Sequence, residues 1–440
     1  MSKVLEDIEK LPASQRLDPY LDLLTTYLRS KDMRGLLQLI GHVVRVDGDE
    51  LPTSTRPQLV APFVRTTVQR LLQADGYRAD HLDLDDCETV GRTMVELLQR
   101  RGADSFPEAL YYAVDFLATV LEAHEKFEEA VQTRTGSFDM ARQAVRFPDL
   151  FTPHARVRWN MHIASCLLQA SNTAAVTPAI SLSGSGENQY ASDALRTLQK
   201  VANLVNQIED EALKVPYQFM YAESLERCGR TTEAANRYME LAFQPPSSAL
   251  SESRRNIALQ NAALLALLSP ASPSRSRVLS HLLNDKRFDA SPLHDYTMRV
   301  VFERMIPRAS LDVLLFMLPE RMSCSSGPTN SKQVMLRWRE HNLMAASRIY
   351  KNISLKSLAE LLECNEEEAE ELAVRLILNN QLAASVDQEN GCVVFNQAQS
   401  ELALWREQVA HVCQALTDLS DTIASSYPAL GVDGVTPDQE

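Results

Sequence analysis

Apolar residues recur at helical spacing along most of the chain. Up to about residue 330, leucine, valine and alanine return every three or four positions, and loops rich in proline, glycine and serine separate these segments. Paired amphipathic helices of this kind usually stack on their neighbours, because a single pair cannot bury its apolar face. The pattern predicts a mainly α fold whose N-terminal part is a helical-repeat solenoid.

Boundary residues place the first helices. Asp18-Pro19 is typical of a helix cap and first turn, and Gly35 is expected to precede a helix over Leu36–Val46. No convincing alternating strand is found before residue 380. The N-terminal region is therefore expected to be helix after helix.

One helix pair resembles the tetratricopeptide pattern. Gly229 falls at the turn, and small or apolar residues stand at the helix positions Ala222, Leu225, Ala234, Tyr238 and Leu241. A weaker copy begins at Ala118 and continues at Ala130, but Glu125 replaces the turn glycine and Arg134 replaces the aromatic residue. These copies favour antiparallel helix pairs that approach each other closely.

A third copy of the pattern is interrupted. It begins at Ala164 and resumes at Ala194, and residues 171–189 between them are rich in serine, threonine, glycine, proline and alanine. Such a composition is typical of an exposed loop. We therefore expect an insertion within a repeat.

The pattern changes after residue 337 to the order helix, strand, helix, helix, hairpin. Ile353 is expected to be extended, Ser354 to cap the second helix, and Asn365 to begin the third with a capping box. Two short apolar segments follow, and Asn390-Gly391 suits the turn between them. This order predicts a winged helix over residues 338–396.

The last helix carries a heptad pattern. Its apolar residues alternate spacings of three and four: Leu402, Trp405, Val409, Val412, Leu416, Leu419 and Ile423. One interpretation is a helix folded back on its own domain, and the other is a helix in a bundle with other chains. The strict spacing favours the bundle, because an ordinary docked helix has a broader apolar stripe.

These patterns divide the chain into segments. At 440 residues it is expected to hold about two to three domains. The predicted segments are an N-terminal repeat arm (1–215, with the insertion 171–189), a helical part (216–337), the winged helix (338–396), a C-terminal bundle helix (397–427) and a disordered tail (428–440).

Charge argues against nucleic acid and anionic membranes as partners. The chain has 58 acidic and 44 basic side chains, a formal charge of −14. In DNA-binding winged helices the third helix is usually basic. Here that helix holds five glutamates between residues 366 and 371, and its one basic residue is Arg375. A winged helix that contacts protein is expected.

Neither a secretory signal nor a membrane span is predicted. The seven cysteines include no C-x-x-C pair and are typical of reduced thiols in a cytosolic or nuclear protein. The chain is therefore expected in the cytoplasm and nucleus.

Sequence patterns of catalysis are incomplete. His124-Glu125-x-x-Glu128 begins like a zinc protease helix but lacks the second histidine, and Gly184-x-Gly186 completes neither a phosphate loop nor a dinucleotide fingerprint. There is no Gly-x-Ser-x-Gly elbow, and the acidic run Asp83–Asp86 is better explained as an exposed face. We therefore expect that the chain has no catalytic residue, metal ligand or cofactor site, and that it is not an enzyme.

Several segments resemble the PCI-domain subunits of the COP9 signalosome. They are Tyr221–Glu223, Glu233–Tyr238, Leu282–Arg287, Glu340–Leu343 and Ile349–Ile353. The resemblance is strong over residues 215–425 and weaker before them. Related PCI subunits of the 26S proteasome lid are the nearest alternative, and a winged-helix DNA-binding regulator is a more distant one.

The resemblance implies a non-catalytic scaffold and substrate-sensing subunit, in a complex that removes NEDD8 from cullins of cullin-RING ubiquitin ligases. Its partners would be other PCI subunits, a metalloprotease subunit pair and the ligase substrate. The heptad residues would join a shared bundle, and winged-helix sheets would join edge to edge. The sheet residues expected there, some of which can equally be domain core, are Ile353, Val386, Val393, Val394 and Phe395.

Overall fold

The computed structural model describes residues 5, 8, 10–12, 15–44, 56–73, 76–77, 83–100, 105–176, 189–318, 329–395 and 401–426. The chain forms two compact units. Unit 1 comprises Met1–His294 and Leu314–Gln333, and unit 2 comprises Asp295–Val313 and Val334–Glu440. The chain therefore passes between the units more than once.

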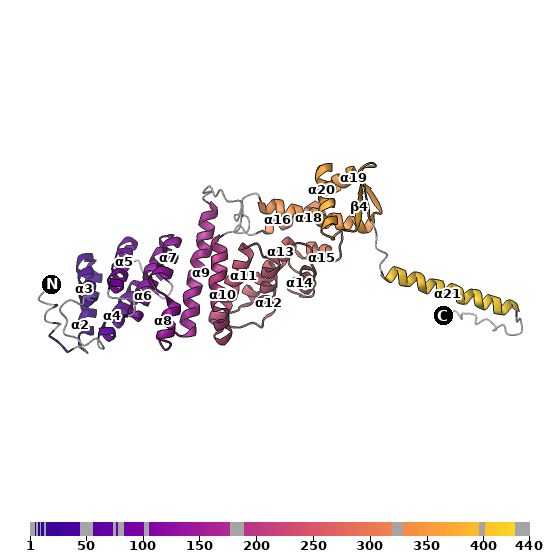
Figure 1. The fold of residues 1–440 in the computed structure, drawn as a ribbon. Coiled ribbons are helices and arrows are strands. Elements are labelled where there is room, and N and C mark those ends of the chain that lie inside the picture. The colour runs from indigo at the N-terminus through magenta and orange to yellow at the C-terminus, as the bar shows by residue number, and fades with distance from the viewer. Residues whose placement is uncertain are drawn as a thin grey trace. The chain divides into compact units, whose positions relative to one another are not determined.

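Unit 1 is built from helices that pack on their sequence neighbours (Figure 1). A continuous core of buried leucine, valine, alanine and aromatic side chains runs through the part of unit 1 between Ile8 and Tyr217. This confirms the predicted helical solenoid. The helices are α2 (Leu17–Ser30), α3 (Met33–Val44), α4 (Arg56–Leu71), α5 (Leu84–Arg100), α6 (Pro107–Ala123), α7 (Phe127–Ser137), α8 (Met140–Arg146), α9 (Pro153–Val176), α10 (Gln189–Gln207), α11 (Glu211–Arg227), α12 (Thr231–Phe243), α13 (Glu252–Leu268) and α14 (Pro273–Leu283).

The two best copies of the repeat have the same turn. In the α11–α12 pair Gly229 has φ +76°, and in the α6–α7 pair Glu125 has φ +60° at the corresponding position. The next backbone N–H in each pair donates to an equivalent carbonyl, Arg230 to Leu225 and Lys126 to Leu121. Glutamate thus adopts a conformation that favours glycine, so the weaker copy is a true copy.

Two predicted helix starts were wrong. Helix α2 begins at Leu17, ahead of Asp18, and Gly35 lies inside α3. Asp32 sets the start of α3, because its Oδ1 accepts from Gly35 N at 3.1 Å. Gly35 is needed there for space, since a Cβ would lie 2.8 Å from the Tyr27 ring.

The insertion is shorter than predicted. Helix α9 continues to Val176 and α10 begins at Gln189, so only residues 177–188 lie outside the described elements. Ser171 remains helical and buried, because it belongs to the inner face of α9 despite its loop-like residue type. A two-residue antiparallel pair, β1 (Leu72–Gln73) and β2 (Gly76–Tyr77), was also missed because it is too short to show alternation.

Unit 2 contains the predicted winged helix. The elements that lie wholly or partly in unit 2 are α15 (His294–Val301), α16 (Arg308–Met317), α18 (Thr329–Ile349), β3 (Asn352–Ser354), α19 (Leu355–Leu362), α20 (Glu366–Leu378), β4 (Ala384–Asp387), β5 (Cys392–Phe395) and α21 (Glu401–Ser426). The end of α16 and the start of α18 belong to unit 1. The sheet is antiparallel, in the order β3-β5-β4, with Val393 opposite both Ile353 and Val386. Apolar faces of α18, α19 and α20 pack on it.

The local signals of the winged helix were confirmed with one exception. Ser354 caps α19 by accepting from Ser357 N at 3.2 Å, and Gly391 has φ +61° in the hairpin turn. Asn365 is the N-cap of α20, but its side chain makes no capping hydrogen bond. Glu368 pairs with Arg339 on α18 at 3.0 Å, so the expected capping box is not formed.

Two further features bear on the sequence predictions. No helix in the described part of the chain is long and apolar enough to cross a membrane. No disulfide joins any of the cysteines that the structure describes. The predicted tail, residues 428–440, lies outside the described residues.

Candidate partner interfaces

The sheet residues proposed as an interface divide into two groups. Ile353, Val393 and Phe395 are buried in the winged-helix core, and Val386 is half-buried. Only Val394, 36 % exposed, presents its side chain to solvent. The edges of this sheet are the strands β3 and β4, and its described face is not a broad apolar surface.

A polar face of α18 holds the loop between α15 and α16. Trp338 Nε1 and Asn342 Nδ2 both donate to Ile306 O, at 2.9 and 3.1 Å, and Ile306 N donates to Asn342 Oδ1 at 2.8 Å. His341 Nε2 lies 2.9 Å from Arg304 O, so this nitrogen carries the ring proton. We call Trp338, His341 and Asn342 the α18 clamp. Because the clamp side chains hydrogen-bond to the backbone of Arg304 and Ile306, polar residues can be buried within Glu340–Leu343.

The heptad helix α21 presents its apolar stripe to solvent. The described stripe residues range from 41 % exposed at Val409 to 63 % at Trp405, and Val412, Leu416 and Leu419 lie between. The side chains of Leu402 and Ile423 lie outside the described residues. These large apolar side chains thus form an exposed row along one face of α21.

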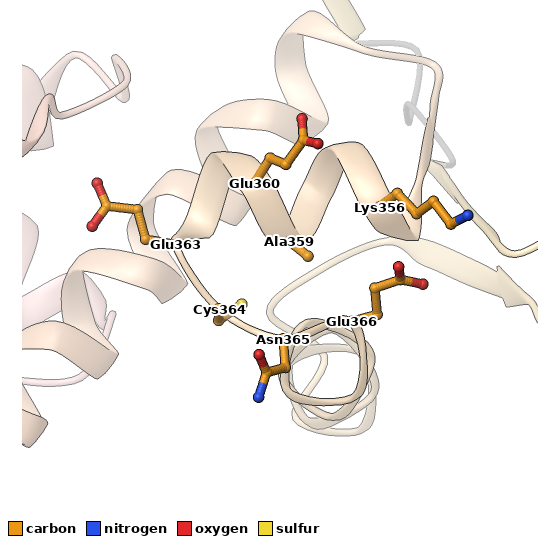
Figure 2. Close-up of a pocket in the computed structure, with 7 residues that line it drawn as sticks. All are labelled: Lys356, Ala359, Glu360, Glu363, Cys364, Asn365 and Glu366. Atoms are coloured by element: carbon orange, nitrogen blue, oxygen red, sulfur yellow. The ribbon is translucent and has the colours of Figure 1, made fainter.

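The acidic helix α20 borders a polar cavity of about 610 Å³. Figure 2 shows Glu360, Glu363 and Glu366 among the residues that line it, with Lys356 on the same side as Glu366. Glu363 also pairs with Arg308 at 3.0 Å. This surface would repel phosphates, because its negative charges outnumber its positive ones.

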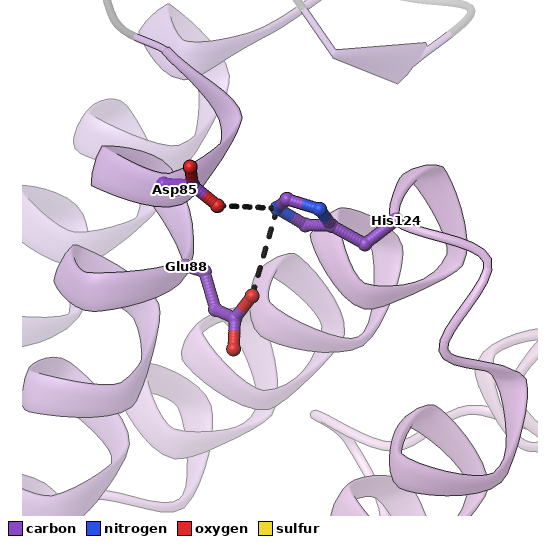
Figure 3. Close-up of side chains that lie close together, drawn as sticks. All are labelled: Asp85, Glu88 and His124. Atoms are coloured by element: carbon purple, nitrogen blue, oxygen red, sulfur yellow. Dashed lines mark ion pairs between the residues drawn. The ribbon is translucent and has the colours of Figure 1, made fainter.

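A histidine–carboxylate group joins α5 to the end of α6. His124 Nε2 lies 3.6 Å from Asp85 Oδ1 and 3.5 Å from Glu88 Oε2 (Figure 3). Glu88 also binds Lys126 at 3.0 Å and Arg92 at 2.7 Å. Burial alone would raise the pKa of Glu88, but hydrogen bonds from Lys126 and Arg92 outweigh it and lower the pKa. This carboxylate is already matched by two cations, which favours an ion-pair network over a metal site.

Arg134 forms a buried ion-pair cluster within the repeats. Its guanidinium is fully buried, pairs with Glu122, and lies 3.1 Å from Asp115 Oδ1 and 3.2 Å from Cys166 Sγ. Burial would lower the pKa of Arg134, but the Glu122 and Asp115 carboxylates hold it above its usual value. Burial and Glu122 raise the pKa of the Cys166 thiol, which therefore stays protonated. The sequence indicated only that Arg134 stands where the repeat pattern has an aromatic residue, and it did not indicate the ion pairs.

Comparison with known proteins identifies the C-terminal region. The PCI domain family matches residues 318–397, which include α18 and the winged-helix sheet. The chain is 25 % identical to COP9 signalosome complex subunit 4 of Arabidopsis thaliana, over 93 % of this chain and 94 % of the relative. Proteins of the same name match at 27 % identity in Drosophila melanogaster (52 % of this chain, 56 % of the relative) and 25 % in Dictyostelium discoideum (55 % and 60 %). The chain carries a PCI domain, as predicted.

Proposed function

We propose that this PCI-domain protein is a scaffold and substrate-sensing subunit of the COP9 signalosome, present in cytoplasm and nucleus, and that it supports removal of NEDD8 from cullins. Its similarity extends over nearly the whole length of a relative named as a subunit of that complex. The observation that carries the proposal is the uncovered heptad stripe of α21. A stripe that its own chain leaves in water is stabilised when helices of other subunits cover it.

Two surfaces contribute differently to assembly. The α21 stripe supplies apolar burial, and β3 and β4 supply main-chain hydrogen bonds to the sheet of a neighbouring subunit. Ile353, Val393 and Phe395 support the second surface indirectly, by fixing the strands on their own core. Val394 is the sheet side chain available for contact.

Catalysis is assigned to a partner in this proposal. The chain contributes no catalytic residue, metal ligand or cofactor site, and a metalloprotease subunit pair would cleave the NEDD8 conjugate on a bound cullin-RING ligase. Among described residues, the one group with metal-ligand geometry is Asp85, Glu88 and His124, and its central carboxylate is occupied by Lys126 and Arg92. Turnover of a neddylated cullin by the purified chain alone would contradict this assignment.

The decisive experiment changes only the stripe. Val412→Asp with Leu416→Asp is expected to remove the chain from its complex, because charges replace apolar contacts, while its unfolding temperature stays unchanged because both side chains are exposed in the chain alone. Affinity purification with mass spectrometry measures the partners. The matched control is Gln414→Asp with Thr417→Asp, which adds the same charge outside the stripe.

The outcomes separate the alternatives. Signalosome subunits recovered with the parent and control chains, but lost with the stripe variant, support the proposal. Recovery of 26S proteasome lid subunits would support the related lid scaffold, which none of the similar proteins named here favours. Assembly that survives the stripe variant would overturn the role given to α21.

A further inference from the structure

We propose that a cavity in unit 1, where α7, α8, α9 and α10 meet, binds an acidic segment of a protein partner that carries one bulky apolar side chain. The inference goes beyond the scaffold role, because it concerns a ligand that unit 1 binds without α21 or the winged helix. Charge, shape and an unsatisfied buried donor support it.

The cavity has an apolar floor and a preformed shape. Its volume is about 460 Å³, within the range of about 300–1,000 Å³ that is typical of ligand pockets. Phe138, Trp159, Ile163 and Val201 line it and are themselves buried. The Phe138 and Trp159 rings lie 5.5 Å apart and pack with Tyr111, so the floor is rigid. A rigid apolar floor suits an aromatic or aliphatic side chain.

The rim of the cavity is positively charged. Arg156 on α9 and Lys200 on α10 line it, and neither side chain has an ion-pair partner among the residues described. Asp139 is the one carboxylate in the lining, and it caps α8 by accepting from Arg142 N at 3.1 Å. Apart from Arg134, whose charge is matched by Glu122 and Asp115, the lining thus has two cations and one carboxylate. This local excess of cations complements an acidic ligand.

A buried donor in the cavity wall lacks an acceptor. Arg134 lines the cavity with its side chain fully buried, and its Nε has no hydrogen-bond partner among the described groups. Unsatisfied buried donors are uncommon in folded proteins. The two Nη atoms of Arg134 already pair with Glu122 and Asp115, so Nε is the nitrogen of this side chain left for a further acceptor.

The apolar surface extends along α8. Ala141 lines the cavity, and Val145, one turn further on the same helix face, is 84 % exposed. Phe147 is also partly exposed just after α8. A peptide is proposed as the occupant because carboxylates beside one apolar side chain match the Arg156 and Lys200 rim beside the apolar floor.

The test uses the purified full-length chain and labelled peptides. A short fluorescein-labelled peptide of aspartate and glutamate with one central phenylalanine is expected to bind in fluorescence anisotropy, more weakly as salt rises. Replacing its phenylalanine by serine should weaken binding by about tenfold, because the floor is then left in contact with water. A peptide with lysine in place of the acids should not bind.

Substitutions locate the site. Lys200→Glu or Arg156→Glu should weaken binding of the acidic peptide by about tenfold, and Thr197→Trp should do so by filling the cavity. The matched control is Arg196→Glu on the same helix, whose side chain is 74 % exposed and does not line the cavity. It should bind as the parent does. Unchanged unfolding temperatures show that the variants are folded.

Three results would overturn the site. They are equal affinity of Lys200→Glu and Arg196→Glu for the acidic peptide, equal affinity of the parent chain for the phenylalanine and serine peptides, and tighter binding of a single-stranded oligonucleotide than of the acidic peptide. The α21 stripe variant keeps α7–α10 intact and should bind the peptide normally. Loss of assembly and loss of peptide binding are therefore distinguishable.

Discussion

Arg134 stands in the α6–α7 pair where Tyr238 stands in the α11–α12 pair. Tyr238 donates its hydroxyl to Glu226 Oε2 at 3.3 Å, and Arg134 contacts Glu122 at the corresponding position. The same repeat thus uses either a phenol or a guanidinium to satisfy one carboxylate. Burial costs a guanidinium more hydration free energy than it costs a phenol. Arg134 therefore stabilises the fold only while it keeps its carboxylate partners.

Arg134→Met should therefore destabilise unit 1 by about 3–5 kcal/mol, because it leaves Glu122 partly buried without its cation. Arg134→Tyr is the matched variant and should cost less, since a hydroxyl can again reach Glu122. Chemical denaturation of the full chain measures both. Equal losses would mean that lost packing volume, rather than the unpaired carboxylate, sets the cost.

Glu88 gives stability that depends on pH. Its pKa is lower in the folded chain than the usual 4.5, because hydrogen bonds from Lys126 and Arg92 outweigh burial. A carboxyl group of this kind adds stability that is fully present above its unfolded pKa and is lost as pH falls through its folded pKa. The Glu88 contribution should thus disappear on acidification below 4.5.

Glu88→Gln should lower the free energy of unfolding at neutral pH by about 1–2 kcal/mol. The difference from the parent chain should shrink below pH 4.5, where the parent loses the same interaction. Thermal unfolding over a pH series measures it. Glu96→Gln on the same helix, with a 60 % exposed side chain, is the control and should change little. A difference that stays constant with pH would rule out the ion-pair explanation.

At the scale of elements, α18 combines two tasks. Its apolar face packs in the winged-helix core, and its clamp face binds Ile306. The clamp satisfies both backbone groups of Ile306, which are buried and would otherwise be left without partners. One helix therefore fixes the α15–α16 loop on the winged helix.

Asn342→Leu should destabilise unit 2 by about 2–3 kcal/mol, because it leaves Ile306 N without an acceptor. Trp338→Phe is the milder comparison, since Ile306 O keeps its bond from Asn342 Nδ2. Hydrogen exchange at the Ile306 amide should rise in the first variant and change less in the second. An amide that stays protected in Asn342→Leu would show that the clamp is dispensable.

Periodicity predicted most helices because each buries one face, and regular apolar spacing also predicted the stripe of α21, which is exposed. It could not predict the α18 clamp, since Asn342 and Ile306 lie far apart in sequence and the acceptor is a backbone carbonyl. It also could not decide between interface and core for Ile353, Val393 and Phe395. Strands of three or four residues show alternation but do not show which face another element covers.

At the scale of the whole molecule, the units are compact but interleaved in sequence. Residues 295–313 belong to unit 2, and residues 314–333 belong to unit 1. The cavity proposed in unit 1 likewise combines α7–α10, which no local sequence pattern joins. Only the folded arrangement brings Arg134, Arg156 and Lys200 to one place.

A fragment of residues 294–440 should be more stable than one of residues 329–440, although both contain the winged helix. The longer fragment retains Ile306 for the clamp, and the shorter one leaves Trp338 and Asn342 without their partner. Urea denaturation measures the difference. Asn342→Leu is the control and should destabilise the longer fragment more than the shorter. Equal midpoints for the two fragments would contradict the assignment of residues 295–313 to unit 2.

The interleaved order also has a consequence during synthesis on the ribosome. Ile306 is translated before Trp338 and Asn342. The α15–α16 loop therefore leaves the exit tunnel before the side chains that hydrogen-bond to the Ile306 backbone have been synthesised. Until they emerge, water is the hydrogen-bond partner of the Ile306 N–H and C=O groups. Completion of α18 is thus the earliest moment at which this stretch reaches its native environment.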